Sequence, residues 1–144
     1  MQIRTFVQAD RARVIELWSV CNLIRPWNDP NKDIDRKLDR DPTGLIVGEL
    51  VSENGAREIA ATIMFGYDGH RGFANYLAVD PARLGEGLGR IMMEEVEGRL
   101  LAMGCPKVNL QIRSDNLGVI SLYERLGYVD DNVASMGKRL IPDM

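Results

Sequence analysis

Two neighbouring segments in the second half of the chain carry residues whose types and spacing could do chemistry. In the first, LGEGLGR (84–90), three glycines stand at alternate positions directly before an apolar run with helical spacing. A helix that begins there exposes backbone N–H groups without intrahelical partners and carries partial positive charge, which together favour phosphate. Glycines also let a ligand approach the backbone closely. The segment predicts a phosphate cradle, with a ligand-free flexible connection as the alternative.

The spacing of these glycines excludes two common nucleotide-binding motifs. No Gly-Lys-Ser/Thr follows the loop, so it is not a P-loop. After Gly85 and Gly87, the third glycine of a dinucleotide fingerprint would fall on Arg90.

The second segment, NLGVISLYERLGY (116–128), carries an amide and a phenol seven residues apart. At about 3.6 residues per turn, Asn116 and Tyr123 fall on nearly the same face of a helix, roughly two turns apart. Both polar groups would therefore face the same side.

The elements that must position these segments alternate between strands and helices. Periodicity and turn residues predict strands over 1–6, 45–51, 58–67, 73–79 and 108–112, with YV and ASMGKRL as two short terminal strands. Asn54-Gly55 favours a tight hairpin. Helices are predicted after the caps Asp10 and Asp29, over 88–103, and over 116–126. The order predicts a mixed α/β sandwich around one sheet, with 1–144 as a single domain.

Composition restricts the class of protein. The 144 residues are 45% hydrophobic and 27% charged, as in an ordinary globular domain, and the net charge is −3. The acidic balance argues against a sequence-independent nucleic-acid partner. Two cysteines and one histidine form no disulfide framework and no metal-ligand pattern, so we expect no metal and a reducing, cytoplasmic setting. No apolar run has the length of a membrane span or a signal-peptide core, so no membrane partner is expected.

Both segments resemble the GNAT superfamily, the Gcn5-related N-acetyltransferases. The family loop has the form Gln/Arg-x-x-Gly-x-Gly/Ala, and Gly87 and Gly89 match its glycines. The family's later helix often reads Asn-x₆-Tyr-Glu-x-x-Gly-Phe/Tyr, which Asn116, Tyr123 and the following Gly-Tyr match. The phrases RPWNDP, YDGHRG and AMGCPK are also similar to small bacterial acetyltransferases of the YpeA type. The resemblance implies a GNAT-like fold, with a central, mostly antiparallel sheet flanked by helices on both faces.

The resemblance implies acetyl transfer from acetyl-CoA to a primary amine. In the family, the pantetheine arm pairs with the splayed end of the strand before the loop, where a backbone N–H can polarise the thioester carbonyl. The expected cofactor-binding residues are Leu77, Ala78, Val79, Leu84, Gly85, Glu86, Gly87, Leu88, Gly89, Arg90 and Asn116. Asn116 could equally serve as a helix cap.

Tyr123 is the expected general acid. A phenol has a pKa of about 10 and a departing thiolate about 8.5, so a tyrosine beside the sulfur can donate a proton. The alternative is a tyrosine that packs on the sheet.

Leu84 departs from the family pattern, which has Gln or Arg there. Arg83 or Arg90 would then supply the charge, or the amides and the helix dipole suffice, and we expect weaker cofactor binding.

The acceptor side is expected to involve Trp27, which could stack on a substrate or simply pack in the core, and Asp29, which could hold the substrate's ammonium or simply cap a helix. Tyr67, Asp68, His70 and Arg71 could line the same cleft from the other side. The general base is not identified: Phe73 stands where some family members carry glutamate, and we expect turn-forming roles for Asp68 and His70, with deprotonation relayed by water.

Three functions follow from these residues. The leading one is acetylation of a small amine, a second is acetylation of a protein N-terminus or lysine, and a third is a non-catalytic acyl-CoA-binding module. A homodimer through the terminal strands is also compatible with the family.

Overall fold

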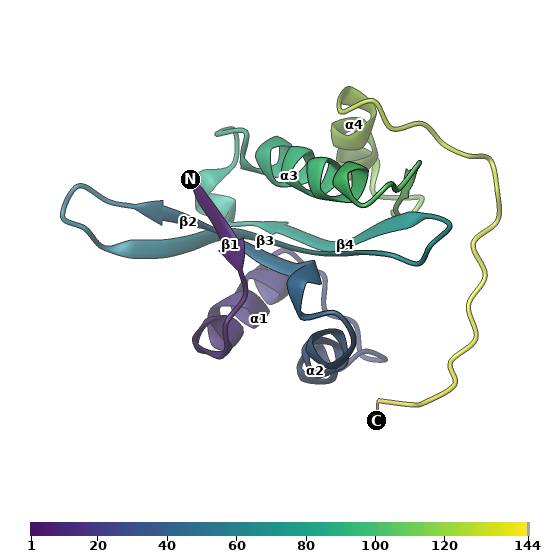
Figure 1. The fold of residues 1–144 in the computed structure, drawn as a ribbon, viewed down its shortest axis with the longest axis horizontal. Helices are drawn as coiled ribbons and strands as arrows, with labels where there is room; N and C mark the ends of the chain where they lie inside the picture. Colours follow the sequence, from purple (N-terminus) through teal and green to yellow (C-terminus); the bar gives the residue numbers. More distant parts are fainter. Residues whose placement is uncertain (144) are drawn as a thin grey trace.

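The computed structural model describes residues 1–143, which form a five-stranded sheet covered by helices on both faces (Figure 1). The strands are β1 (Gln2–Thr5), β2 (Leu45–Val51), β3 (Arg57–Tyr67), β4 (Gly72–Val79) and β5 (Val108–Asn109). The helices are α1 (Arg11–Val20), α2 (Pro30–Arg40), α3 (Leu88–Ala102) and α4 (Leu117–Arg125), with short 3-10 turns at Gln8–Asp10, Pro42–Gly44 and Pro81–Arg83. Among the described residues, no helix combines the length and apolar composition that a membrane crossing needs.

The sheet is mostly antiparallel, as the sequence predicts. Its order is β1-β2-β3-β4-β5, and among the described strands only β4 and β5 run parallel, joined through α3. The β2–β3 hairpin turns through residues 52–56, at the predicted place, but only Gly55 of the Asn54-Gly55 pair has the expected positive φ, at 84°.

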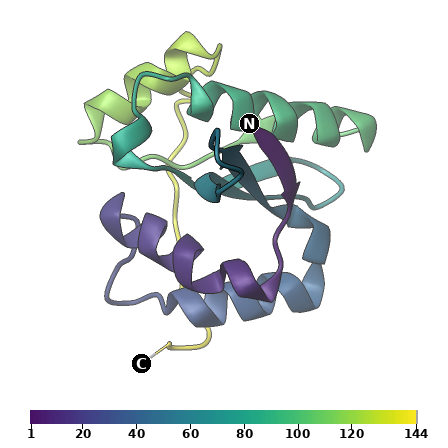
Figure 2. The same cartoon turned by 90° about the vertical axis from the view of Figure 1, so that its left-hand side faces the viewer.

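Two hydrophobic clusters occupy the two faces of the sheet. Figure 2 shows α3 and α4 on one face and α1 and α2 on the other. On the α3/α4 face, the buried cluster is Ile46, Ala61, Ile63, Phe65, Ala74, Met92, Met93, Val96, Leu100, Cys105 and Tyr123. On the α1/α2 face, it is Phe6, Val14, Leu17, Trp18, Ile34, Leu45, Val47, Ile59 and Ala78. β4 contributes to both clusters, so its side chains reach both sides of the molecule.

The helix caps agree with the sequence at α2 and differ at α1. The Asp29 carboxylate accepts hydrogen bonds from the N–H groups of Asn31 and Lys32, at 2.9 and 3.4 Å. Asp10 precedes α1, but its carboxylate makes no cap bond to that helix. It accepts instead from Arg4, at 2.8 and 3.0 Å, and from the N–H of Val7 at 2.9 Å. The expected cap is therefore wrong, because an arginine on β1 binds the carboxylate more strongly than a helix amide would.

The tail forms neither of the two expected terminal strands. It leaves α4 and runs along the edge of the molecule to α2 (Figure 1), held by side chains. Asp131 accepts from Lys107 at 2.8 Å and from Asn109 at 2.8 Å. β5 is only two residues long, shorter than the expected 108–112, and Asn132 has a φ of 61°. Because β5 is short and the backbone at Asn132 is left-handed, the tail cannot form a continuous row of backbone hydrogen bonds with the sheet.

Candidate active site

β4 separates from β5 after two residue pairs, and the candidate site surrounds the resulting gap. Parallel pairing joins Gly72 to Val108 and Phe73 to Asn109, whereas β4 continues to Val79. Within residues 1–143, the backbone of 74–79 has no strand partner on that edge. Apart from the Val79 carbonyl, which accepts from Cys21 Sγ at 3.2 Å, the N–H and C=O groups on that edge can pair with an extended ligand that carries amide groups.

A β-bulge in β4 sets which face its side chains occupy. Tyr76 and Leu77 together oppose a single residue of β3, Ile63. The extra residue takes up a left-handed backbone, since the φ of Tyr76 is 55°. As a result, the neighbouring side chains of Asn75 and Tyr76 both line a cavity on the α1/α2 face. Leu77 packs on the opposite face, against the α3 cluster.

Tyr76 is held in this strained conformation from two sides. Its ring stacks on the indole of Trp18, with centroids 4.0 Å apart. Its hydroxyl donates a 2.6 Å hydrogen bond to Asp33 on α2. Burial, and then the neighbouring carboxylate, raise the pKa of the Tyr76 phenol well above its usual value. The bulge is thus anchored to α1 and α2 together.

The glycine loop has a left-handed backbone at two of its three glycines. Gly85 and Gly87 have φ values of 86° and 77°, and Gly87 precedes α3 directly. Nothing lies within 4 Å of a Cβ built on either residue. In the described chain, the backbone N–H groups of Gly87, Leu88 and Gly89 donate no hydrogen bond. The loop therefore presents open, unpartnered donors at a helix N-terminus.

The loop lies beside the unpaired end of β4. A Cβ built on Gly89 would be 3.8 Å from Val79 Cγ2 and 4.0 Å from Leu122 Cδ2. The first turn of α3 therefore lies between the end of β4 and helix α4. The free amides of the loop therefore lie close to the end of β4 that has no second strand partner among the described residues.

The side chains around the loop explain how the charge is distributed. Leu84 is 72% exposed and points an apolar side chain into solvent. Arg83 pairs with Glu58 at 3.3 Å and with Glu86 at 3.8 Å. Arg90 is 3.8 Å from Glu94. Both arginines that could replace the missing basic residue already have acidic neighbours, so the backbone amides supply most of the positive character of the loop.

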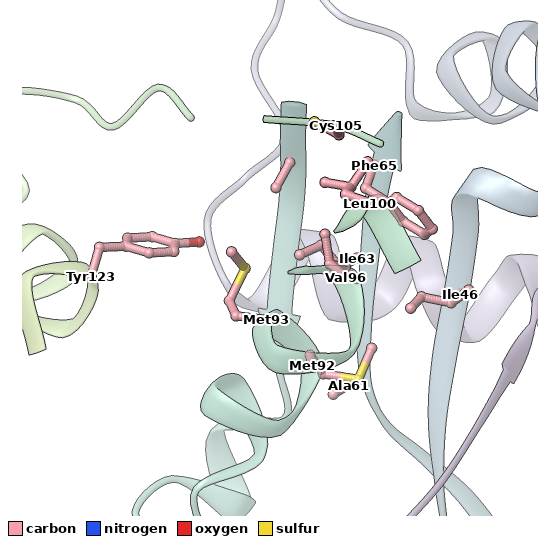
Figure 3. Packing of buried hydrophobic residues seen from close by; sticks show 11 residues of the cluster. Ile46, Ala61, Ile63, Phe65, Met92, Met93, Val96, Leu100, Cys105 and Tyr123 are labelled. Atoms are coloured by element: carbon pink, nitrogen blue, oxygen red, sulfur yellow. The ribbon is translucent and has the colours of Figure 1, made fainter. Parts of the chain in front are cut away.

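Tyr123 extends from α4 into the core of the α3/α4 face, with its hydroxyl directed toward Met93 (Figure 3). It is 8% exposed, and its ring packs edge-on against Tyr128 with centroids 5.5 Å apart. No group in residues 1–143 forms a hydrogen bond with its hydroxyl. Burial raises the pKa of the Tyr123 phenol to about 12, so the group is protonated at neutral pH.

Asn116 forms the N-cap of α4, where its side-chain oxygen accepts from the N–H of Val119 at 3.3 Å. The capping role is therefore present in the structure. A contact to a bound ligand stays a prediction.

A cavity of about 610 Å³ opens on the α1/α2 face beside the bulge. Its aromatic lining is Trp27 and Tyr76. Its charged lining is Arg25, Asp33, Arg36, Lys37, Arg40 and Arg113. A volume of this size suits a small-molecule ligand.

Of the residues expected on the acceptor side, the structure brings Trp27 to this cavity. Its ring is 51% exposed, and the Arg113 guanidinium lies 5.6 Å from the ring centroid. Asp29 caps α2 and does not line the cavity.

The other four expected residues form the β3–β4 turn and do not line the cavity. Asp68 Oδ1 accepts from the N–H groups of His70 and Arg71, both at 2.7 Å. The Tyr67 hydroxyl donates to the carbonyl of Gly69 at 3.2 Å. These bonds close the turn, and the backbone N–H donors lower the pKa of Asp68.

Sequence reasoning missed the polar lining of the cavity. One signal was available: Arg36 and Arg40 are four residues apart on a predicted helix, so both fall on one face. Arg25, Asn75 and Arg113 come from separate loops and strands, and no local pattern connects them.

Comparison with known proteins identifies the family. A family model described as the acetyltransferase (GNAT) family matches residues 11–128. An acetyltransferase of Sodalis glossinidius is 49% identical over 144 residues, covering 99% of this chain and 98% of that protein. The chain belongs to the GNAT family of acetyltransferases. This GNAT chain therefore has the family fold that its sequence predicts.

Two solved structures share that fold at low identity. Ard1 from Thermoplasma volcanium superposes with a TM-score of 0.75 at 20% identity, over 89% of this chain and 82% of that one. Glucosamine-6-phosphate N-acetyltransferase from Arabidopsis thaliana gives a TM-score of 0.67 at 23% identity, over 97% of this chain and 98% of that one.

Proposed function

We propose that this GNAT acetyltransferase transfers the acetyl group of acetyl-CoA to a primary amine of a small molecule, by direct attack in a ternary complex. The observation that carries the proposal is the arrangement around β4. Its unpaired edge and the open glycine loop lie together at one end, while the cavity opens on the other face beside the same strand. Two ligands can therefore meet at one strand from opposite faces of the sheet.

The residues around the gap fit acetyl-CoA. The free N–H groups of 87–89 would hold the diphosphate, and the open space at Gly85 and Gly87 would let it approach the backbone. The unpaired edge of 74–79 would pair with the amides of the pantetheine arm. When bound, acetyl-CoA supplies the acetyl group as a reactive thioester. A backbone N–H of 77–79 on that edge would polarise the thioester carbonyl.

Tyr123 is the proposed proton donor to the thiolate sulfur. At a pKa of about 12, complete proton transfer to a thiolate of pKa about 8.5 is unfavourable. The phenol therefore acts first as a hydrogen-bond donor that stabilises negative charge on the sulfur. Its hydroxyl has no competing protein partner among residues 1–143, so it is free to make that bond.

The size of the cavity favours a small acceptor. About 610 Å³ accommodates a metabolite-sized amine, bounded by Trp27 and by α2. Glucosamine-6-phosphate, which the plant structural neighbour acetylates according to its name, has this size. We propose that deprotonation of the amine is relayed by water. We also propose that, within the GNAT family, this chain is an acetyltransferase of the YpeA type.

The experiment that tests the proposal measures release of free CoA thiol from acetyl-CoA in the presence of small amines and, separately, of peptides. We expect turnover with small amines. Tyr123→Phe should lower kcat by about a hundredfold, the loss expected for one donor at a reacting centre, with little change in KM. Its folding stability should not fall, since the hydroxyl has no partner to lose.

Two outcomes would contradict the proposal. Turnover of peptides alone would assign the acceptor to proteins, and undiminished kcat in Tyr123→Phe would remove Tyr123 from the reaction. Tyr67→Phe is the matched control, because its hydroxyl bonds only within the β3–β4 turn among the described residues.

A further inference from the structure

The lining of the acceptor cavity has the opposite charge to the chain as a whole. The chain has a net charge of −3, yet five cationic side chains and one acidic side chain line this cavity. The cations are Arg25, Arg36, Lys37, Arg40 and Arg113, and the acid is Asp33. They come from α2 and from segments before it and after β5, so the fold gathers them from distant parts of the sequence.

Two of these cations already have protein partners. Lys37 donates to the carbonyl of Phe65 at 2.6 Å and to Asp41 at 3.1 Å. Arg36 donates to Asp143 at 2.7 Å. These two side chains stabilise the structure around the cavity.

The other three cations have no acidic partner among the described residues. Within residues 1–143, no carboxylate lies within 4.0 Å of the guanidinium groups of Arg25, Arg40 or Arg113. Arg113 instead lies over the exposed ring of Trp27. Three unneutralised guanidinium groups around one cavity favour an anionic ligand, because each offers paired N–H donors that match a carboxylate or a phosphate.

The rim of the same cavity already binds one oxyanion from the protein. The Asp143 carboxylate is completely buried and accepts hydrogen bonds from Arg36 and from the N–H of Asp29, at 2.7 and 2.8 Å. Arg139 pairs with it at 2.8 Å. This end of α2 is therefore built to stabilise negative charge.

Asp33 places a negative charge in the same cavity. Its carboxylate accepts a hydrogen bond from the hydroxyl of Tyr76, the residue at the bulge of β4, and lies 3.8 Å from Arg36. An amine is attracted to this side of the cavity and an anion to the arginines.

We propose that the acceptor is a small primary amine that also carries an oxyanion, either a phosphate monoester or a carboxylate, bound by Arg25, Arg40 and Arg113. The inference rests on the proposed function, whose acceptor it specifies. Polycationic amines are the class that this lining rejects.

The first experiment compares acceptors in the thiol-release assay at constant ionic strength. O-phosphoethanolamine and β-alanine represent the two oxyanions, with ethanolamine and 1,3-diaminopropane as neutral and cationic counterparts. We expect kcat/KM for at least one anionic amine to exceed that of both counterparts by about tenfold or more, as for a hydrogen bond to a charged group. A higher kcat/KM for O-phosphoethanolamine alone would identify the oxyanion as a phosphate, and a higher kcat/KM for β-alanine alone would identify it as a carboxylate. Equal or better use of ethanolamine or 1,3-diaminopropane would overturn the proposal.

The second experiment removes the charges one at a time. Arg25→Gln, Arg40→Gln and Arg113→Gln should each raise KM for the anionic amine about tenfold and leave KM for acetyl-CoA unchanged. Arg99→Gln is the matched control, since Arg99 lies on α3, on the other face of the sheet, and pairs with Glu95. Unchanged KM in all three variants would overturn the assignment of the arginines.

A binding measurement keeps the inference testable without turnover. Inorganic phosphate, titrated against sodium chloride of equal ionic strength, should change the emission of Trp27 by moving Arg113 from its ring. The change should be absent in Trp27→Phe and in Arg113→Gln, and in Arg25→Gln and Arg40→Gln it should need about tenfold more phosphate. If phosphate changes nothing, the anion site is wrong. If acetyl-CoA fails to stabilise the protein against heat, the proposed function itself is wrong, so the two failures are distinct.

Discussion

Substituting Gly87 by alanine separates the cost of its backbone conformation from its role in binding. Gly87 precedes α3 with a φ of 77°, and Gly55 turns the β2–β3 hairpin with a φ of 84°. A Cβ built on either residue meets no atom within 4 Å. The two positions therefore impose the same backbone strain on alanine and no steric clash, and only Gly87 lies in the proposed cofactor loop.

The expected sizes follow from these geometries. A left-handed alanine costs about 1 kcal/mol relative to glycine, or about 3 to 5 °C in melting temperature for a chain of this length. Acetyl-CoA at one hundred times its Kd would stabilise the wild type by about 2.7 kcal/mol. If the added methyl group at Gly87 weakens binding tenfold, the same concentration contributes only about 1.4 kcal/mol.

The assay measures melting temperature with and without acetyl-CoA for the wild type and both variants. We expect Gly55→Ala and Gly87→Ala to lose similar stability without ligand. With acetyl-CoA, Gly55→Ala should gain as much as the wild type, and Gly87→Ala about half as much. Equal gains in both variants would refute the cradle at 85–90, and unequal losses without ligand would refute the strain argument.

Three further predictions concern stability. Arg4→Gln should lower the free energy of unfolding by about 2 kcal/mol in urea, because Arg4 is hydrogen-bonded to the nearly buried carboxylates of Asp10 and Glu49; an unchanged urea midpoint would contradict this. The N–H of Asp29, and then Arg36, hold the pKa of Asp143 below its usual value, so the unfolded chain binds more protons between the two pKa values. The contribution of Asp143 to stability should therefore be constant above about pH 5 and be lost as the pH drops below 4, so that stability falls less steeply in Asp143→Asn, which urea midpoints across pH will show. Gly44→Ala should destabilise by about 2 kcal/mol, since its Cβ would collide with a backbone carbonyl of β3, and a wild-type melting temperature would exclude that collision.

The sequence predicts elements well where a local chemical signal marks them. The Asp29-Pro30 pair starts α2, and Asn54-Gly55 turns the hairpin, because each residue acts on its own neighbours in the chain. Asp10 has the same local signal and behaves differently, since Arg4 on β1 competes for its carboxylate. Prediction therefore fails where a distant charged partner forms a stronger bond than the local amide.

The terminal strands fail for a related reason. A strand needs a neighbour to pair with, and β5 ends at Asn109 after two residues. The alternation of side chains in ASMGKRL is compatible with a strand, but β5 is too short to provide backbone hydrogen-bond partners along this segment. Met136 and Leu140 stay exposed as a result.

The same distinction between local signals and distant partners applies to the candidate site. The proposed cofactor half consists of two short segments, the loop 84–90 and the pair Asn116 and Tyr123, and each shows its pattern within a few residues of sequence. The acceptor half is assembled from α2, β4 and the segments around Arg25 and Arg113, and depends on a bulge at Tyr76. No pattern in FANYLAV indicates that bulge, because it arises from pairing with β3 and from the stack on Trp18.

The bulge in β4 also determines how substitutions can affect the proposed cofactor site and the proposed acceptor cavity. It directs Tyr76 to the acceptor cavity and Leu77 to the cluster beneath α3, so one strand serves both faces. Apart from β4, the described residues of the proposed cofactor site and of the acceptor cavity lie on different elements. Substitutions on α2 can therefore change which amine binds without altering the loop before α3, because distant sites contribute independently. Removal of Tyr76 would instead make the pairing with β3 regular: residues 77–79 would stay opposite residues 61–63 and keep their faces, while the proposed acceptor cavity would lose the ring that stacks on Trp18.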